Sequence, residues 1–253
     1  MPSNATLEKK KQIGQLDYDV FDGPHKTRLL KRRISELSDY DGPLGLDTET
    51  GGPGKKDGLL PWRGRVRLIQ VAMPGYALVV DLDGWRSKPQ GFAEEKKAAP
   101  NRKVPWHLDG LRELKALLES QHAKALQNAP FDLTWLRCEG VKVGGPIFDT
   151  MIGAKIITAG TRWGSGLDDI AKRYLKIVLD KTYQKFDYNT PEIPAEALMY
   201  AAKDAAILTM LVGPIKDRLV ESGLWHIFKL EMQILRPVAE MRWNGMGFDA
   251  VAC

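Results

Sequence analysis

The feature that most constrains the fold of this 253-residue sequence is a pair of apolar runs, residues 65–73 and 76–82, separated only by Pro74-Gly75. Charged and aliphatic residues alternate in the first run, which is typical of a strand, and the Pro-Gly pair predicts a turn. Another strand is predicted over residues 42–49, where turn residues lead into a short apolar stretch. These three consecutive strands predict an antiparallel meander.

Downstream of these strands the pattern changes to helices and strands in alternation. Helices are predicted over residues 108–120, 130–138, 149–158, 167–175 and 194–212, with a short strand over residues 123–127. Ser165 is a predicted N-cap, and Gly213-Pro214 is predicted to end or kink the longest helix. Residues 86–106 contain almost nothing to bury and predict a flexible insertion. Together these elements indicate an α/β fold, a mixed β-sheet flanked by helices.

The composition excludes several classes of protein. With 43% hydrophobic and 27% charged residues, the chain has enough apolar material for a globular core. We expect no membrane partner, because no stretch approaches the roughly 18 uncharged apolar residues of a membrane span and residues 1–11 lack the apolar part of a signal peptide. Two cysteines and four histidines without ligand-like spacing exclude a cysteine or histidine metal site. Any metal must therefore be held by oxygen. The net charge of +5 suits a polyanionic partner.

Three short patterns contain the candidate functional residues: Asp47-Thr48-Glu49, Asn128 to Asp132, and Tyr200 to Asp204. Each is weak alone, since a chain with 32 acidic residues contains about one Asp-x-Glu by chance. Their placement is more informative. Asp47 and Glu49 share one face of a strand, and Tyr200 and Asp204 share one face of a helix. Asp132 falls in the first turn of the helix that Pro130 opens.

Taken singly, these residues have ordinary structural explanations: exposed strand-end charges, a first-turn acid, a solvated helix residue and a packing tyrosine. Four carboxylates that converge in a low-dielectric cleft, however, repel one another strongly unless divalent cations neutralise them. Ligation by oxygen alone selects Mg²⁺ or Mn²⁺. The joint pattern therefore predicts a divalent-cation site formed by the four acids, Asp47, Glu49, Asp132 and Asp204.

The order of the three motifs resembles the DEDD 3′–5′ exonucleases, in the subgroup with Tyr in the third motif. Residues 67–72 and 167–175 resemble the same family around its second strand and before its third motif, so the resemblance extends over residues 41–212. It implies a ribonuclease-H-like fold. Residues 230–249 resemble the segment where a family A, polymerase I-like DNA polymerase passes from its proofreading domain into its polymerase domain.

The resemblance implies three parts. Residues 1–40 are an N-terminal extension with a first helix, residues 41–220 are the exonuclease domain, and residues 221–253 are the truncated start of a polymerase-like region. The implied partners are a single-stranded DNA 3′ end and the polymerase domain of the same parent chain. The implied compartment is the cytoplasm of a bacterial or phage-type system, with an organelle as the alternative.

The implied chemistry is two-metal hydrolysis of the terminal phosphodiester of single-stranded or frayed DNA, which releases 5′-mononucleotides. Asp47, Glu49 and Asp204 would hold one divalent cation, and Asp47 with Asp132 the second. Tyr200 would orient the attacking water. The implied substrate-binding residues are Asn128, Thr48, and a stacking face from Tyr183 or Phe186.

Three alternatives remain open at this point. A ribonuclease D-like exoribonuclease has the same site, with RNA as its substrate. A catalytically weak nucleic-acid-binding module would have lost acids, whereas all four carboxylates are present here. A phosphate-binding loop at residues 51–56 is disfavoured, because no Ser or Thr follows its lysines.

Overall fold

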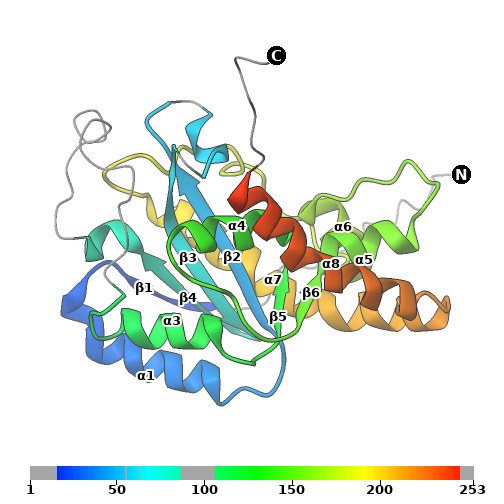
Figure 1. The fold of residues 1–253 in the computed structure, drawn as a ribbon, viewed down its shortest axis with the longest axis horizontal. Coiled ribbons are helices and arrows are strands. Elements are labelled where there is room, and N and C mark those ends of the chain that lie inside the picture. Colours follow the sequence, from blue (N-terminus) through cyan, green and yellow to red (C-terminus); the bar gives the residue numbers. More distant parts are fainter. Residues whose placement is uncertain (1–15, 55, 62, 87–105, 246–253) are drawn as a thin grey trace, which may run out of the picture.

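The computed structural model describes residues 16–54, 56–61, 63–86 and 106–245, and its centre is a six-stranded mixed sheet in the order β1-β4-β3-β2-β5-β6 (Figure 1). The strands are β1 Asp17–Phe21, β2 Leu44–Gly51, β3 Arg65–Met73, β4 Tyr76–Asp81, β5 Lys124–Leu126 and β6 Ile147–Asp149. Strand β3 is antiparallel to β2 and β4, whereas β1 is parallel to β4 and β5 is parallel to β2 and β6. The predicted meander, β2-β3-β4, is confirmed.

The first strand is a finding that the sequence did not predict. Strand β1 pairs in parallel with β4, with Asp17 opposite Tyr76 and Phe21 opposite Val80. Only Phe21 of this strand is fully buried, and the alternation of Tyr18 and Val20 with acids is too short to identify a strand by itself. The predicted N-terminal extension therefore contributes an edge strand to the sheet, followed by the helix α1, Thr27–Ser38.

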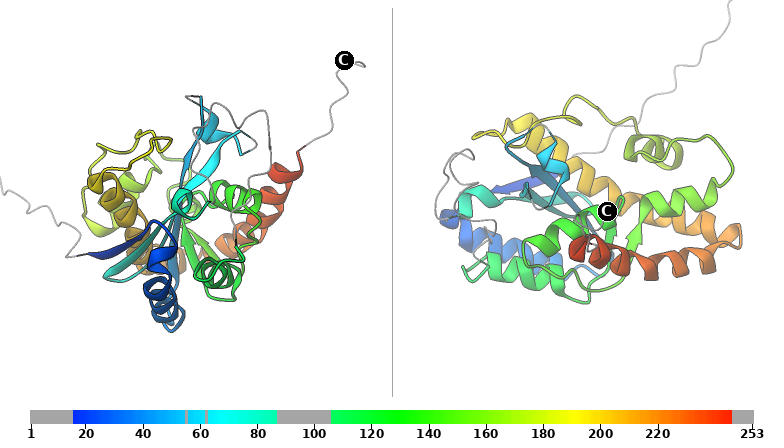
Figure 2. Two further views of the ribbon diagram at one scale, coloured as in Figure 1. Left: turned by 90° about the vertical axis from the view of Figure 1, so that its left-hand side faces the viewer. Right: turned by 45° about the horizontal axis from the view of Figure 1, so that its top comes forward.

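Helices cover both faces of the sheet, which lies between them in Figure 2 (left). The remaining helices are α3 Leu111–Glu119, α4 Pro130–Cys138, α5 Thr150–Ile157, α6 Leu167–Leu175, α7 Ala195–Glu221 and α8 Trp225–Asn244. Helices α1, α3, α4 and α8 share one apolar core with one face of the sheet, and α7 packs on the opposite face. This arrangement confirms the predicted α/β class, a mixed sheet flanked by helices.

Helix α7 lies unusually close to the sheet because small residues meet at the contact. Ala201, Ala202 and Ala205 are fully buried against the sheet, and a Cβ on Gly45 would lie 2.0 Å from the carbonyl oxygen of Ala205. Helix α7 is long and apolar enough, by length and composition alone, to cross a membrane. In this fold its alanines form the contact with β2, β3 and β4.

Two predicted helix boundaries are wrong. Helix α7 continues through Pro214 to Glu221, because Ile215 and Leu219 beyond the proline are fully buried and pack with α8. The carbonyl that loses its helical donor belongs to Met210, which is 39% exposed and accessible to water. Ser165 does not cap α6. The N-cap is Gly166, and the Ser165 carbonyl accepts a hydrogen bond from Gln127 at 2.9 Å.

The predicted insertion, residues 86–106, lies outside the described residues except at its two ends. Arg86 and Trp106 both bond to Glu139, through its carboxylate at 2.9 Å and its carbonyl at 2.7 Å, respectively. Of the predicted polymerase-like region, residues 246–253 also lie outside the description. Helix α8 packs on α4 and α5, with Phe228, Leu235 and Ala239 buried, so it is part of the same core as the sheet.

Candidate active site

Strand β2 presents the first two acids toward α7. Leu44, Leu46 and Thr48 point to the α4 side of the sheet, so Asp47 and Glu49 point to the other side. A β-bulge interrupts the pairing with β3 directly after Glu49. Bulges of this kind redirect side chains near functional sites. Asp47 and Glu49 are both half-buried on this face of the strand.

Asp132 approaches from the neighbouring edge. Strand β5 pairs with only the first two residues of β2, so the edge of β2 beside Asp47 and Thr48 is open to the first turn of α4. The Thr48 hydroxyl donates a hydrogen bond to Asp132 at 2.6 Å across 84 residues of sequence. Thr48 therefore positions one predicted ligand, and Asp132 is 2% exposed in consequence.

The turn that leads into α4 is fixed by another acid. Asn128 has a φ of 60°, a left-handed conformation that Asn tolerates better than most residues. The fully buried Asp149 accepts hydrogen bonds from the backbone N–H groups of Asn128 at 3.3 Å, Ala129 at 2.6 Å and Ile152 at 3.0 Å. Asp149 thus caps α5 and holds the strained turn that carries Asn128 toward the site.

Helix α7 supplies the third motif, in which Tyr200 and Asp204 lie one turn apart on the same face of the helix. Tyr200 and Asp204 are half-buried, and the Tyr200 ring lies 6.4 Å from the ring of Tyr183, centroid to centroid. The Asp204 and Asp47 charges act on each other, as do those of Glu49 and Asp204. The two acids of β2 and the acid of α7 therefore face one another across the space between strand and helix.

A cavity of about 490 Å³ lies at this meeting point. Seven of the predicted site residues line it: Asp47, Thr48, Glu49, Asn128, Tyr183, Tyr200 and Asp204. Asp132 lies behind this lining, bonded to Thr48. Phe186 is not placed on the cavity wall. Its ring packs on Tyr183 and Tyr188, with centroids 5.8 and 5.0 Å away, so it supports the Tyr183 ring from behind.

The electrostatics of the four acids are those of a crowded anionic site. Burial raises the pKa of Asp47 to about 7. Burial first, and then the negative charge of Asp47, raises the pKa values of Glu49, Asp132 and Asp204 well above the usual range of carboxyl groups. No described lysine, arginine or histidine forms an ion pair with any of the four. These acids therefore hold their protons to higher pH than ordinary carboxyl groups do.

This donor set fits divalent cations chemically, although the side chains are not gathered into a finished ligand sphere. Within the described ranges, no three acidic, histidine or cysteine side chains stand close enough together to ligate one ion as placed. The four carboxylates are hard oxygen donors of the kind that Mg²⁺ and Mn²⁺ prefer. Gln70, which pairs with Asp47 across the sheet, is fully buried, and its side-chain amide has no hydrogen-bond partner among the described residues. The nitrogen and the oxygen of the Gln70 amide therefore lie beside the acids without a hydrogen-bond partner among the described residues.

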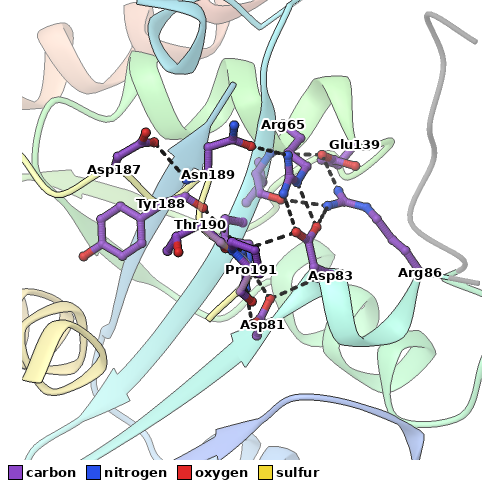
Figure 3. A network of polar contacts seen from close by, with 12 residues as sticks. Arg65, Asp81, Asp83, Arg86, Glu139, Asp187, Tyr188, Asn189, Thr190 and Pro191 are labelled. Atoms are coloured by element: carbon purple, nitrogen blue, oxygen red, sulfur yellow. Dashed lines mark hydrogen bonds and ion pairs between the residues drawn. The ribbon is translucent and has the colours of Figure 1, made fainter. Parts of the chain in front are cut away.

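Behind the site, a buried network of arginines and acids anchors the segment before α7 (Figure 3). Arg67 forms a bidentate ion pair with Asp81 at 2.7 and 2.9 Å. The same guanidinium donates to the carbonyls of Tyr188 at 3.4 Å, Thr190 at 2.5 Å and Pro191 at 3.2 Å. This segment places the Tyr188 hydroxyl beside Glu49, and burial, followed by the Glu49 charge, raises the pKa of Tyr188.

Sequence reasoning missed several members of this site, namely Gln70, Asp149, Asp168, Lys181 and Tyr188. Gln70 lies within the matched segment, residues 67–72, and its period-two placement opposite Asp47 was a usable signal. Asp168 lies within the other matched segment, residues 167–175, so it too had a usable signal. The other three depend on long-range packing, and no local pattern identifies them.

The class of protein follows from this arrangement. A mixed sheet flanked by helices, with acids of its central strand and of a long helix at one cavity, is the arrangement of the ribonuclease-H-like fold. Brucella melitensis NrnC bound to pGG superimposes with a TM-score of 0.68 and 21% identity, covering 94% of this chain and 98% of that one. Escherichia coli RNase D, an exoribonuclease involved in structured RNA processing, superimposes with a TM-score of 0.65 and 18% identity. The match covers 91% of this chain and 52% of that one. At 18% to 21% sequence identity, the similarity to these two structures shows a shared fold.

The family is shown by the sequence. The family model of the 3′–5′ exonuclease of family A DNA polymerases matches residues 23–220, and the chain belongs to this family. DNA polymerase I of Aquifex aeolicus is 25% identical over 252 residues, which are 92% of this chain and 36% of that protein. DNA polymerase I of Rhizobium leguminosarum is 30% identical over 150 residues, or 56% of this chain and 14% of that protein. The chain thus spans about a third or less of these relatives.

The raised pKa values predict how cations and pH act together on stability. The pKa of Asp47 is about 7 in the folded protein and about 4 when unfolded. Its contribution to folding is therefore present below pH of about 4 and is lost as the pH rises through about 7. At pH of about 8 we expect Mg²⁺ or Mn²⁺, at about 100 times its Kd, to stabilise the protein by about 2.7 kcal/mol, since the carboxylates are then free to bind it.

Thermal unfolding with chelator and with cation, at pH of about 8 and of about 5.5, measures this effect. The cation should raise the Tm by about 5 to 10 °C at the higher pH and by much less at the lower one. Asp204→Asn should lose most of this dependence. Equal shifts at both pH values, or in the variant, would contradict a cation site made of these carboxylates.

Proposed function

We propose that this protein removes nucleotides one at a time from the 3′ end of single-stranded or frayed DNA, with two divalent cations held by Asp47, Glu49, Asp132 and Asp204. The observation that carries the proposal is the convergence of residues from three distant segments. Asp47, Glu49, Tyr200 and Asp204 line one cavity, and Thr48 ties Asp132 to its edge. Divalent cations, when bound, lower the pKa of an attacking water and stabilise the charge on the leaving oxygen.

The side chains around the acids have separable tasks in this proposal. Burial, followed by the Asp204 charge, raises the pKa of Tyr200 above its ordinary value, so its phenol stays protonated at neutral pH and serves to orient water rather than to accept a proton. Asn128 and Tyr183, which both line the cavity, contact the terminal nucleotide in this proposal. A cavity of about 490 Å³ admits an unpaired nucleotide and no duplex.

Selectivity for frayed ends follows from the need for an unpaired nucleotide. A mismatched end unpairs more readily than a matched one, so it reaches the acids more often without any base-specific contact. We therefore propose a proofreading role beside a polymerase domain of the same parent chain. Membership of the family and the two DNA polymerase I relatives support DNA as the substrate. RNA is the second candidate, which the fold shared with RNase D favours.

A direct assay tests the function. The protein is incubated with 5′-labelled single-stranded DNA and with RNA of the same sequence, in Mg²⁺ or Mn²⁺, and the products are separated by length. We expect a ladder shortening from the 3′ end of the DNA, faster than for RNA, and no ladder in excess chelator. A faster RNA ladder would assign the ribonuclease alternative, and degradation that persists in chelator would contradict metal-dependent hydrolysis.

Replacing Tyr200 by Phe tests its role separately. The variant keeps the ring against Tyr183 and loses the hydroxyl, so kcat should fall about tenfold or more while KM changes little. Tyr40→Phe is the matched control, because the Tyr40 ring stacks on His122, 6.4 Å away, outside the cavity lining. Equal kcat values for wild type and Tyr200→Phe would make this tyrosine a packing residue only.

A further inference from the structure

The charges that line the cavity are strongly unbalanced. Five described lining residues are acidic: Asp47, Glu49, Asp168, Asp180 and Asp204. Among the described lining residues, only Lys181 carries a positive charge. A nucleic acid strand brings further negative charge into this space. Cations bound by the four motif acids would neutralise the reacting phosphodiester, but the neighbouring phosphates of the strand need a positive group of their own.

Lys181 stands where such a phosphate would pass. Its ammonium group lies 2.5 Å from the Asp168 carboxylate and joins the first turn of α6 to the segment before α7. The Lys181 side chain is 58% exposed, whereas that of Asp168 is 21% exposed. The hydrogen bond and the charge of Asp168 raise the pKa of Lys181, so it is charged at any pH of interest. The ion pair therefore joins two segments that line the cavity, and Lys181 is its more exposed member.

Stability alone does not explain this pair. Ion pairs exposed to water contribute little to folding, because solvent and salt screen them. Asp168 also lies close enough to Asp204 to raise the pKa of that acid. Removing Asp168 would therefore relieve repulsion around the motif acids. An acid placed close to Asp204, and paired with the only cation of the described lining, has a clearer purpose in holding that cation in place.

We propose that Lys181 binds a backbone phosphate next to the scissile phosphodiester, and that Asp168 holds the ammonium group at the cavity mouth until the strand replaces it. This inference rests on the proposed function and adds a specificity-determining residue to it. A strand with a neighbouring phosphate exchanges the carboxylate partner of Lys181 for a phosphate. A substrate that has a single phosphodiester offers no such exchange.

The experiment compares two substrates: a single-stranded oligonucleotide and the p-nitrophenyl ester of thymidine 5′-monophosphate, which has no neighbouring phosphate. Lys181→Ala should lower the ratio of their kcat/KM values, oligonucleotide over ester, by about tenfold. The slope of log kcat/KM against log salt concentration for the oligonucleotide should become shallower by about 0.7, the value for one lost phosphate contact on a single strand. Lys181→Arg should keep both the ratio and the slope.

Two further variants separate phosphate binding from a structural role. Lys229→Ala removes an exposed lysine of α8 that does not line the cavity, so it should keep the ratio and slope of the wild type. Asp168→Asn frees the ammonium group without removing it, so the salt slope should stay that of the wild type, while the ratio should fall by less than it does in Lys181→Ala. If Asp168→Asn makes the slope as shallow as Lys181→Ala does, the ion pair rather than a phosphate contact sets the slope, and the inference is overturned.

The failure of this inference is distinguishable from that of the proposed function. A wild-type protein that hydrolyses the oligonucleotide, with an unchanged ratio in Lys181→Ala, would overturn the role of Lys181 alone. A wild-type protein that hydrolyses neither substrate in Mg²⁺ or Mn²⁺ would overturn the exonuclease proposal and this inference with it.

Discussion

Asp204→Asn is expected to reduce the release of mononucleotides by at least about a thousandfold while making the metal-free protein more stable. The activity falls because the variant loses one of the carboxylates proposed to hold the cations that carry the chemistry. The stability rises because burial and the charge of Asp47 both raise the pKa of Asp204. A neutral amide removes this repulsion without changing the shape of the side chain.

Two measurements are needed: single-turnover hydrolysis of a labelled oligonucleotide with Mg²⁺, and thermal unfolding in chelator at pH of about 8. Asp217→Asn is the matched control, since Asp217 is an exposed acid of the same helix outside the cavity lining. It should leave both quantities near those of the wild type. Asp47→Asn should behave like Asp204→Asn. An Asp204→Asn protein that is less stable and still active would show that the carboxylate is structural.

The sequence predicted the parts of the fold that local physical chemistry determines. Strands β3 and β4 were found because their apolar pattern and the Pro74-Gly75 turn are local signals, and α4 has the predicted bounds because Pro130 opens it. The five-residue β1 and the three-residue β6 were missed, since both are too short for a pattern of period two to stand out. Helix α7 extends beyond Pro214 because tertiary packing outweighs the preference of proline to end a helix.

The site was predictable only as a set of motifs. The period of a strand and of a helix places Asp47 with Glu49 and Tyr200 with Asp204, and this is as far as spacing alone can go. The contact of Thr48 with Asp132 spans 84 residues, and those of Arg67 with the segment before α7 span 121 to 124. Contacts at such separations depend on the assembled sheet, so no window of sequence contains them.

Arg67→Met is expected to have the second large effect, on the scaffold rather than on the chemistry. Arg67 is 3% exposed and satisfies Asp81 together with the carbonyls of Tyr188, Thr190 and Pro191. Methionine retains only the aliphatic part of the side chain and has no donors, so Asp81 and three backbone carbonyls lose the hydrogen bonds of the guanidinium. Removing one member of a buried ion pair destabilises proteins by about 3 to 5 kcal/mol. Activity should fall as well, because the released segment places Tyr188 beside Glu49.

Denaturant unfolding measures the first effect, and Arg218→Met is its control. Arg218 pairs with Glu221 at 3.3 Å, and both side chains are at least 60% exposed, so its loss should change the free energy of unfolding by less than about 1 kcal/mol. Excess Mg²⁺ should not restore Arg67→Met, because the defect lies in the segment before α7 and not in the acids. If the two variants lose equal stability, the network of Figure 3 does not anchor this segment. A large difference would mean that an arginine of β3 anchors the segment that places Tyr188 beside Glu49.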